Sequence, residues 1–284
     1  MPQARRRTIS SQAVPPPLIE CRDVTVYRGQ VRALDRLSLT IAAGEHVAIL
    51  GPNGCGKSTF IKTLTCECYP AIEATPFTLR IMGRDRWSVA ELRQMLGIVS
   101  QDLIAECTRG KSSDFAELPR RVTGRETVLS GFFSSIGIPP HLDVTPAMGR
   151  KADEILARLE IAHLAERPLN ELSSGEARRL VIARALVHDP AALVLDEVAN
   201  SLDMRAAHQL REMTRAIAQA GTAVVIVTHN LSEIIPEIDR VILLRDGRVL
   251  DDGPKERLLT SEALTRTFDL PIDVGRRDGY FHAW

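Results

Sequence analysis

Short apolar runs and helix-patterned stretches alternate along most of the chain. Apolar and polar positions alternate with period two over 19–26 and 37–41, which predicts strands with one exposed face. Continuous apolar runs of strand length, which predict buried strands, occupy 46–50, 97–100, 192–195 and 223–227. Helical spacing lies between the last two runs, as a crossover between parallel strands requires. We therefore predict an α/β fold with a mostly parallel sheet and antiparallel strands near the N-terminus.

The segment 102–170 differs from the rest of the chain in its pattern of polar and apolar positions. A polar stretch at 109–121 is followed by an apolar stretch at 128–133 that predicts a helix, and by amphipathic helical spacing around Ile155 and Leu159. Farther on, two short apolar runs flank Asp246-Gly247, a dipeptide typical of tight hairpins. The pattern predicts an inserted α-helical subdomain in a single larger domain.

These patterns divide the chain as follows. Arginines and prolines without strand or helix periodicity predict a disordered tail over 1–18. One domain is expected over 19–284, with its core at 19–101 and 171–250, the helical subdomain at 102–170 and a C-terminal extension at 251–284. The extension is too short to be an independent substrate-binding domain.

Composition narrows the class of protein. The 284 residues are 44% hydrophobic, and 36 basic against 36 acidic side chains give no net charge to draw the chain onto nucleic acid or an anionic membrane. Aromatic residues make up only 4%, which argues against a base-stacking platform. No apolar run approaches the roughly 20 residues of a membrane span, and no signal-peptide pattern opens the chain. A soluble, cytoplasmic protein is expected.

The five cysteines do not form a pattern of disulfides or of a zinc site. Their number is odd and their spacing lacks paired CxxC motifs, so reduced thiols are expected. We interpret Cys66 and Cys68 as helix-surface residues rather than as metal ligands.

A glycine-rich loop between a predicted strand and a predicted helix carries the first chemical signal. The motif GxxxxGK[ST] cradles phosphates, because its glycines let backbone N–H groups surround an anion at a helix N-terminus. Lys57 is expected to neutralise the β- and γ-phosphates, and Ser58 to hold Mg²⁺. The matching residues, which predict a P-loop NTPase core that binds ATP, are Gly51, Pro52, Asn53, Gly54, Cys55, Gly56, Lys57, Ser58 and Thr59.

Two acids follow the buried strand predicted at 192–195. The carboxyl ends of parallel strands are where α/β sheets place ligands. Asp196 is expected to reach Mg²⁺, and Glu197 to polarise the attacking water as general base. In isolation such a pair is more often a solvated strand end, but the upstream P-loop favours the catalytic interpretation.

The sequence Leu172-Ser173-Ser174-Gly175-Glu176 precedes helical spacing and by itself indicates only a helix N-cap. Its place in a longer succession changes this interpretation. The P-loop, Gln101, this pentapeptide, the Asp-Glu pair, Asp203 and His229 follow one another in an order that resembles the ATP-binding cassette (ABC) ATPases along nearly the whole chain from Ile19. The resemblance is to the bacterial type with one cassette per chain.

The resemblance implies further roles. Tyr27 is similar to the aromatic residue that stacks on adenine, Gln101 to the switch glutamine that senses Mg²⁺ and the γ-phosphate, and His229 to the switch histidine that contacts the γ-phosphate. Asp203 is similar to the acid of the loop that crosses the dimer interface. The signature residues, which in the family face the γ-phosphate held by the opposite subunit, are Ser173, Ser174, Gly175 and Glu176.

The chain departs from the family pattern at two places. Ser174 replaces the middle glycine of LSGGQ, a change that we expect to be tolerated. Val198-Ala199 stand where Pro and then Ser or Thr usually follow the catalytic Glu. Without the proline the φ angle of this turn is not fixed, so the path to Asp203 is less defined than the chemistry at Glu197.

The resemblance implies an ATP-binding and ATP-hydrolysing subunit of an ABC transporter that acts as a head-to-tail homodimer. It would lie at the cytoplasmic face of the membrane as a peripheral protein, with integral permease subunits as partners, an extracytoplasmic substrate-binding protein as a further partner, and no nucleic acid. In the family, the region from Gln101 to Phe133 meets the coupling helices of the membrane subunits, and we expect at least one Phe to line that groove. The sequence of this chain does not indicate which solute is transported.

Two alternatives stay open from the sequence. A soluble ABC ATPase acting on nucleic acid or ribosomes would carry the same motifs, but the ribosomal ones generally hold two cassettes and the DNA-repair ones coiled-coil or zinc insertions. This chain has one cassette and neither insertion. A small-molecule kinase needs only the P-loop, and leaves the signature, Asp203 and His229 unexplained.

Overall fold

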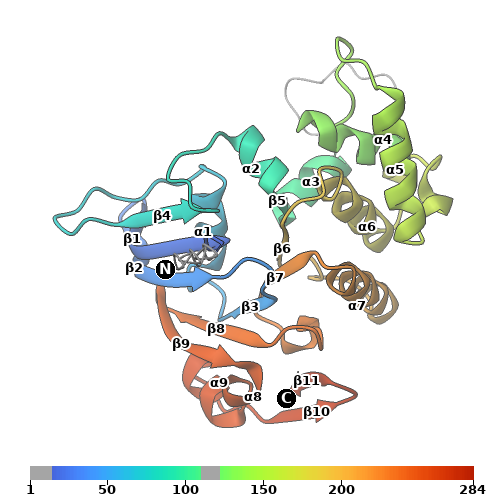
Figure 1. Ribbon diagram of the computed structural model, residues 1–284. Coiled ribbons are helices and arrows are strands. Elements are labelled where there is room, and N and C mark those ends of the chain that lie inside the picture. The colour runs from blue at the N-terminus through green and yellow to red at the C-terminus, as the bar shows by residue number, and fades with distance from the viewer. Residues whose placement is uncertain (1–14, 110–121) are drawn as a thin grey trace, which may run out of the picture.

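The computed structural model describes residues 15–109 and 122–284, and its centre is a sheet of six strands (Figure 1). The strand order is β5-β6-β7-β3-β8-β9, in which all neighbours are parallel except β8 and β9. The strands are β3 (Val47–Leu50), β5 (Leu96–Val99), β6 (Ala192–Asp196), β7 (Ala223–Thr228), β8 (Arg240–Arg245) and β9 (Arg248–Pro254). The predicted α/β class with a mostly parallel sheet is confirmed.

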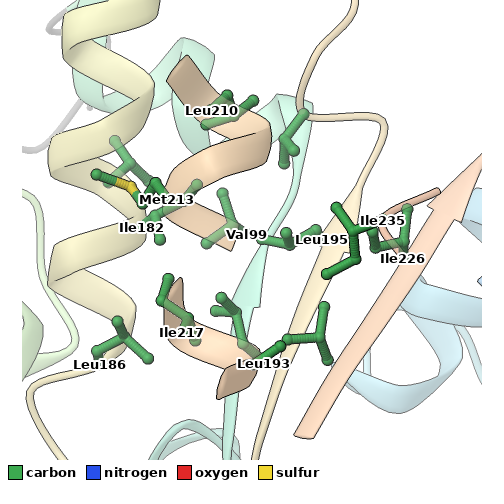
Figure 2. Packing of buried hydrophobic residues seen from close by; sticks show 14 of the residues in the cluster. Val99, Ile182, Leu186, Leu193, Leu195, Leu210, Met213, Ile217, Ile226 and Ile235 are labelled. Carbon is green, nitrogen blue, oxygen red and sulfur yellow. The ribbon is translucent and has the colours of Figure 1, made fainter. Parts of the chain in front are cut away.

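Alternation along these strands builds a core on each face of the sheet. Val47 and Ile49 point toward α1 (Lys57–Leu64), whereas Ala48 and Leu50 point toward α6 (Ser174–Ala185) and α7 (Met204–Gln219). Figure 2 shows the second core, where strand residues meet side chains of both helices. Because both faces are covered, these strands are apolar throughout, which is why the sequence shows continuous apolar runs rather than alternation.

A second, antiparallel sheet packs over the α1 face. Its order is β2-β1-β4, with β1 at Ile19–Arg28, β2 at Val31–Ile41 and β4 at Thr78–Ile81. The predicted N-terminal strands are therefore present and longer than expected. Leu18, which we assigned to the tail, is fully buried and accepts a hydrogen bond from the Met82 amide, so it belongs to the folded part. Residues 1–14 lie outside the described residues.

Helices lie just before β5 and throughout the described part of the segment that the sequence set apart. They are α2 (Val89–Met95, before β5), α3 (Gln101–Arg109), α4 (Gly124–Leu129), η1 (Ser130–Phe133), α5 (Pro146–Arg158), η2 (Ala162–Leu164) and η3 (Leu169–Glu171). Figure 1 shows α4 and α5 at the upper right, away from the sheet. Except for Arg109, the predicted polar stretch 109–121 lies outside the described residues.

The helix predicted over 128–133 is present, but it changes from the α-helix α4 to the 3-10 helix η1 at Ser130. Arg184 of α6 contacts the chain at this change. Its Nε donates to Ser130 Oγ at 3.1 Å, and a Cβ on Gly131 would lie 2.4 Å from the Arg184 carbonyl oxygen. The close approach of α6 thus fixes Ser130 and Gly131, which sequence periodicity cannot register.

The C-terminal part folds back onto the main core. The predicted hairpin at Asp246-Gly247 joins β8 and β9, and β9 continues to Pro254. After it come α8 (Lys255–Leu258), α9 (Ser261–Phe268), β10 (Val274–Arg277) and β11 (Tyr280–Ala283). Leu264 and Phe281 are buried in the same core as α7. The predicted boundaries of domain, subdomain and extension stay predictions.

The cysteine pair at 66 and 68 does not lie on a helix surface as we expected. Helix α1 ends at Leu64, Cys66 takes a positive φ of 61°, and Cys68 is buried with Arg28 Nη1 3.3 Å from its Sγ. Among the described helices, none has the length and apolar character needed to cross a bilayer.

Candidate functional site

The P-loop, Gly51 to Thr59, joins the carboxyl end of β3 to the first turn of α1. The Gly51 amide donates to the Thr228 carbonyl at 3.3 Å, and a Cβ at Gly51 would lie 2.2 Å from the Leu244 carbonyl oxygen. Gly56 caps α1 with a φ of 108°, a conformation that side-chain-bearing residues rarely adopt. The two neighbouring strands and the αL turn thus hold the loop in the shape that directs amides inward.

Lys57 is bound within this loop. Its side chain is only 4% exposed, and Nζ donates to the carbonyl oxygens of Gly51 at 2.8 Å and Pro52 at 2.9 Å. Glu197 Oε1 lies 3.4 Å from the same Nζ. The ammonium group is therefore held between the phosphate loop and the predicted general base.

Glu197 contacts residues from several different elements around the site. Its Oε1 lies 3.3 Å from His229 Nδ1, its Oε2 accepts a hydrogen bond of 2.9 Å from Asn200, and its carbonyl oxygen accepts one of 3.0 Å from Gln101 Nε2. The backbone has a positive φ of 51°, which is strained for Glu. The structure thus brings Gln101, Lys57 and His229 together around Glu197.

The residues predicted to hold Mg²⁺ share one pocket. Ser58, Gln101, Asp196 and Glu197 line a cavity of about 190 Å³ at the carboxyl edge of the sheet. Asp196 is 7% exposed, and its Oδ1 atom is buried without a hydrogen-bond partner. Burial and, to a smaller extent, the negative charge of Glu197 raise the pKa of Asp196 to about 6. A cation or a hydrogen-bond donor beside this carboxylate would stabilise its ionised form. A hydroxyl, an amide and a carboxylate are oxygen donors that suit Mg²⁺.

Two residues near this site were missed by the sequence analysis. Asn200 binds the Glu197 carboxylate, and its place three residues after Glu197 in a turn was the available signal. Glu233, in η4 (Leu231–Glu233), is buried; burial, together with the charge of Glu197, raises its pKa to about 7 although Thr228, Arg178 and Arg211 act in the opposite sense. Nothing in the local sequence pattern distinguishes Glu233 from a solvated carboxylate.

Tyr27 lies on the β1–β2 hairpin beside the P-loop. Its ring is 43% exposed, and its hydroxyl accepts a hydrogen bond of 2.8 Å from Arg32 Nη2 and donates one of 3.2 Å to Glu73. A Cβ on Gly56 would lie 2.6 Å from the carbonyl oxygen of Ala33 in β2, which shows how closely the hairpin abuts the loop. The ring is thus held in place with area left for stacking.

The signature residues lie at the N-terminus of α6, apart from the pocket. Ser173 and Glu176 form a capping box, as the helix-cap interpretation predicted. A Cβ on Gly175 would lie 2.7 Å from Ala206 Cβ, so a glycine is needed there for α6 and α7 to approach. No residue of 173–176 lines the described cavity that holds Asp196. Contact of these residues with phosphate stays a prediction.

Asp203 begins α7. Its Oδ1 accepts a hydrogen bond of 2.8 Å from the Ala206 amide, which caps the helix, and the residue is exposed. The path from Glu197 to Asp203 is a series of turns without the usual proline, closed by hydrogen bonds from the Asn200 amide to Glu197 and from the Leu202 amide to Ala199. Those contacts define this turn where the proline is missing.

A larger cavity of about 610 Å³ opens on the side of the helical segment. It is bounded by the end of α1, by α2 and α3, and by the end of α6, with Val89, Leu92, Leu103 and Arg184 among its lining residues. From the stretch 128–133 only Gly131 lines this cavity, and neither Phe132 nor Phe133 does. That a Phe lines the groove for the membrane subunits stays a prediction. Phe132 instead packs edge-on against His188, at 5.4 Å between ring centroids.

Comparison with known proteins agrees with this geometry. The family model described as "ABC transporter" matches residues 34–200. The hemin import ATP-binding protein HmuV of Bradyrhizobium diazoefficiens is 33% identical, over 92% of each chain. The cobalt import ATP-binding protein CbiO of Rhodobacter capsulatus is 34% identical, over 87% of this chain and 82% of its own.

A solved structure is similar over most of this chain as well. It is a dimeric ATP-binding cassette in a post-hydrolysis state, bound to ADP and phosphate, with 26% identity and a TM-score of 0.63. The likeness covers 83% of this chain and 98% of that one. The chain therefore belongs to the ABC transporter family, as the ATP-binding and ATP-hydrolysing subunit that energises transport through separate membrane subunits.

Proposed function

We propose that the protein is a Mg²⁺-dependent ATPase that drives import of a metal-containing solute. The observation that carries the ATPase part is the pocket shared by Ser58, Gln101, Asp196 and Glu197, with an unpartnered carboxylate oxygen on Asp196. Ser58, Gln101 and Asp196 would hold the cation. Bound Mg²⁺ supplies positive charge that neutralises the β- and γ-phosphates of ATP.

Glu197 is the general base in this proposal. It accepts a proton from the water whose oxygen bonds to the γ-phosphorus, while the bond from that phosphorus to the bridging oxygen breaks and ADP leaves. Because Glu197 Oε1 lies within 3.4 Å of both Lys57 and His229, an arriving γ-phosphate competes with it for the same two groups. Binding of ATP thus frees the carboxylate to act on water.

A second copy of the chain completes the site. The exposed signature residues Ser173 and Ser174 do not line the pocket around Asp196, so within one chain they are free to serve another nucleotide. The relative of known structure with 26% identity is a dimer bound to ADP and phosphate. Both observations support a head-to-tail homodimer with two ATP molecules between P-loop and signature.

The 610 Å³ cavity is the surface that we assign to the membrane subunits. It lies beside α3, which begins at Gln101, and Gln101 in turn binds the Glu197 carbonyl, so a segment seated there would contact the catalytic site through one helix. Permease subunits at this groove would hold the protein at the membrane as a peripheral subunit. An extracytoplasmic substrate-binding protein would deliver the solute to them.

The solute class rests on the relatives alone. Those named above are described as importing hemin and cobalt, and both solutes contain a metal. We therefore propose import of a metal complex, with hemin as the first solute to test.

Reconstitution with the integral partner tests this function. A cysteine at Val89, in a Cys66→Ser background, should cross-link to an integral membrane protein, whereas one at exposed Leu270, outside the groove, should not. In proteoliposomes holding the captured partner, ATP and Mg²⁺ should drive hemin uptake, and EDTA should stop both uptake and hydrolysis. Cross-links only to nucleic acid or ribosomal proteins would contradict the transporter function and support a soluble ABC ATPase instead.

A further inference from the structure

The C-terminal hairpin β10–β11 packs against the segment that follows the switch histidine. Main-chain hydrogen bonds in both directions between Asp273 and Trp284, at 3.0 and 3.1 Å, close the hairpin. Its turn lies against Pro236, since a Cβ on Gly279 would be 3.3 Å from the Pro236 ring, and Phe281 is buried in the main core. The hairpin therefore has a fixed place beside the chain that leads from His229 to β8.

Arg211 of α7 connects that segment to the hairpin. Its Nη1 donates to the Ser232 carbonyl oxygen at 3.0 Å, three residues after His229. Its guanidinium carbon lies 5.1 Å from the centroid of the Tyr280 ring, within the range of cation–π contacts. Its Nε is buried without a hydrogen-bond partner, so the ring, the bond to Ser232 and the nearby carboxyl group of Glu233 hold this guanidinium in place.

Tyr280 is itself held at both ends. Its hydroxyl donates to Glu212 Oε1 at 3.2 Å, one residue along α7 from Arg211, and its ring belongs to β11. The ring thus lies across α7 with its orientation set by a hydrogen bond. A planar guanidinium that lies over such a ring loses little further freedom when it binds the Ser232 carbonyl.

Two further hydrogen bonds hold the chain around His229, from Thr228 to Ser232. The Asn230 amide donates to Thr228 Oγ1 at 2.9 Å, and the Ser232 amide donates to Asn230 Oδ1 at 3.0 Å. His229 lies between these anchors, with Nδ1 3.3 Å from the Glu197 carboxylate. Because Ser232 is only three residues from His229 along the chain, a shift of Ser232 would also move His229.

We propose that Arg211 and Tyr280 are positioning residues, through which the C-terminal hairpin sets the place of His229 at the catalytic site. The proposal rests on the function proposed above. It gives the C-terminal extension a role in hydrolysis rather than in nucleotide binding, because the P-loop and Tyr27 lie on other elements. It also ties His229 to α7, the helix that begins at Asp203.

The test uses the full-length protein with Mg²⁺ and ATP, and it separates kcat from KM. A misplaced catalytic group costs up to roughly 100-fold in rate, so Tyr280→Ala and Arg211→Gln should each lower kcat by about 5-fold to 100-fold. KM for ATP should stay within about 2-fold, since uniform binding is untouched. Tyr280→Phe keeps the ring under the guanidinium and should restore most of kcat.

Two comparisons separate positioning from a general loss of structure. The double variant Arg211→Gln/Tyr280→Ala should be no slower than the worse single variant, because both act through the same contact. Arg276→Ala is the matched control. It removes another arginine–ring contact of the same hairpin, 5.3 Å from Phe281, and should leave kcat unchanged. Melting temperature and bound ATP per chain are measured for every variant.

The outcomes decide between the two proposals. If the wild-type protein hydrolyses ATP but Tyr280→Ala and Arg211→Gln keep normal kcat, the positioning role is overturned. Multiplicative losses in the double variant, or an equal loss in Arg276→Ala, would overturn it too. A wild-type protein without Mg²⁺-dependent hydrolysis would refute the proposed function instead.

Discussion

At the scale of single residues, the carboxylate that we predict to be catalytic is held by its backbone conformation and by side chains that lie far apart in the sequence. Glu197 has a φ of 51°, and its amide donates to the Val227 carbonyl at 2.8 Å. The hydrogen bonds of β7 therefore hold a conformation that Glu alone avoids. A substitution that keeps the shape but removes the charge tests the chemistry without disturbing this geometry.

Glu197→Gln should reduce ATP turnover by about 100-fold or more while ATP still binds. An amide cannot accept the proton of the attacking water, but it keeps the size of the side chain. ATP-bound dimers should accumulate, which size-exclusion chromatography with ATP would detect. The parallel variant Glu262→Gln, at an exposed position of α9, should turn over normally. Near-normal turnover in Glu197→Gln would contradict the assignment.

Glu233 allows a prediction of stability against pH. Its pKa is raised from 4.5 to about 7 in the folded protein, mainly by burial, so between these values the folded state binds more protons than the unfolded state. The free energy of unfolding then falls as pH rises through this window, by about 3 kcal/mol at most. Relative to the wild type, Glu233→Gln should gain several degrees in melting temperature between pH 5 and pH 8.

The control for that experiment is Glu237→Gln. Although burial acts against it, hydrogen bonds from Gln219 and Arg215 hold the pKa of Glu237 below its usual range. This carboxylate is ionised in both states throughout the window, so Glu237→Gln should show no such gain. A constant difference between Glu233→Gln and the wild type from pH 5 to pH 8 would show that Glu233 is not a buried proton acceptor.

The residues that the sequence identified are those whose role lies in local geometry. The P-loop depends on glycines at fixed spacing, and Asp196 on its place at the end of a buried strand, so both appear in a linear pattern. Asn200 and Arg211 act through contacts with Glu197 and Ser232 that only the folded chain creates. Such contacts produce no recognisable pattern in the sequence.

At the scale of elements, the predictions held where one element's own pattern decides its structure. Helix α1 (Lys57–Leu64) follows the glycine-rich loop as predicted, because the P-loop starts it and its apolar spacing is regular. The stretch 128–133 is helical as predicted, but its change to a 3-10 helix lies where a neighbouring helix contacts it. The C-terminal extension looked merely polar, since its buried residues are few and spread over short helices and strands.

The contact between α6 and α7 leads to an element-scale prediction. Gly-to-Ala substitution inside a helix ordinarily stabilises by about 1 kcal/mol. At Gly175 the new Cβ would lie 2.7 Å from Ala206 Cβ, so the helices must move apart. We expect Gly175→Ala to destabilise by about 1–3 kcal/mol, seen as a melting temperature lower by a few degrees.

Ser174→Ala and Ala206→Gly complete that experiment. Ser174 is exposed in the same helical turn, so its substitution should leave the melting temperature unchanged. Adding Ala206→Gly to Gly175→Ala should recover part of the loss, because it removes the atom that the new Cβ meets. A Gly175→Ala protein as stable as the wild type would show that the two helices separate at no cost.

At the scale of the whole molecule, the signature residues and the P-loop lie apart within one chain. Ser173 caps α6, whereas the P-loop precedes α1 on the other face of the sheet (Figure 1). The order of motifs in the sequence predicted the family, and the P-loop, Gln101, the Asp-Glu pair and His229 each lie at the end of a strand of the parallel sheet. The assembly depends on surfaces, and a sequence pattern does not say which surfaces meet.

Mixing two inactive variants tests that assembly. Ser173→Arg should abolish hydrolysis with nucleotide affinity of the single chain nearly unchanged, because we expect Ser173 to serve the neighbour's ATP. Lys57→Ala should weaken nucleotide binding itself, since Nζ lies within the phosphate loop. In a head-to-tail heterodimer of the two, one composite site has both an intact P-loop and an intact signature. An equal mixture should regain about one quarter of wild-type activity, because half of the dimers hold one working site of two.

The control mixture replaces Lys57→Ala by the double variant Lys57→Ala/Ser173→Arg. Its heterodimer with Ser173→Arg has no intact signature, so no activity should return. Exchange of chains is checked first with two tags on wild-type protein. If chains exchange and the first mixture stays inactive, each site is built within one chain and the head-to-tail arrangement falls, whatever the chemistry at Glu197.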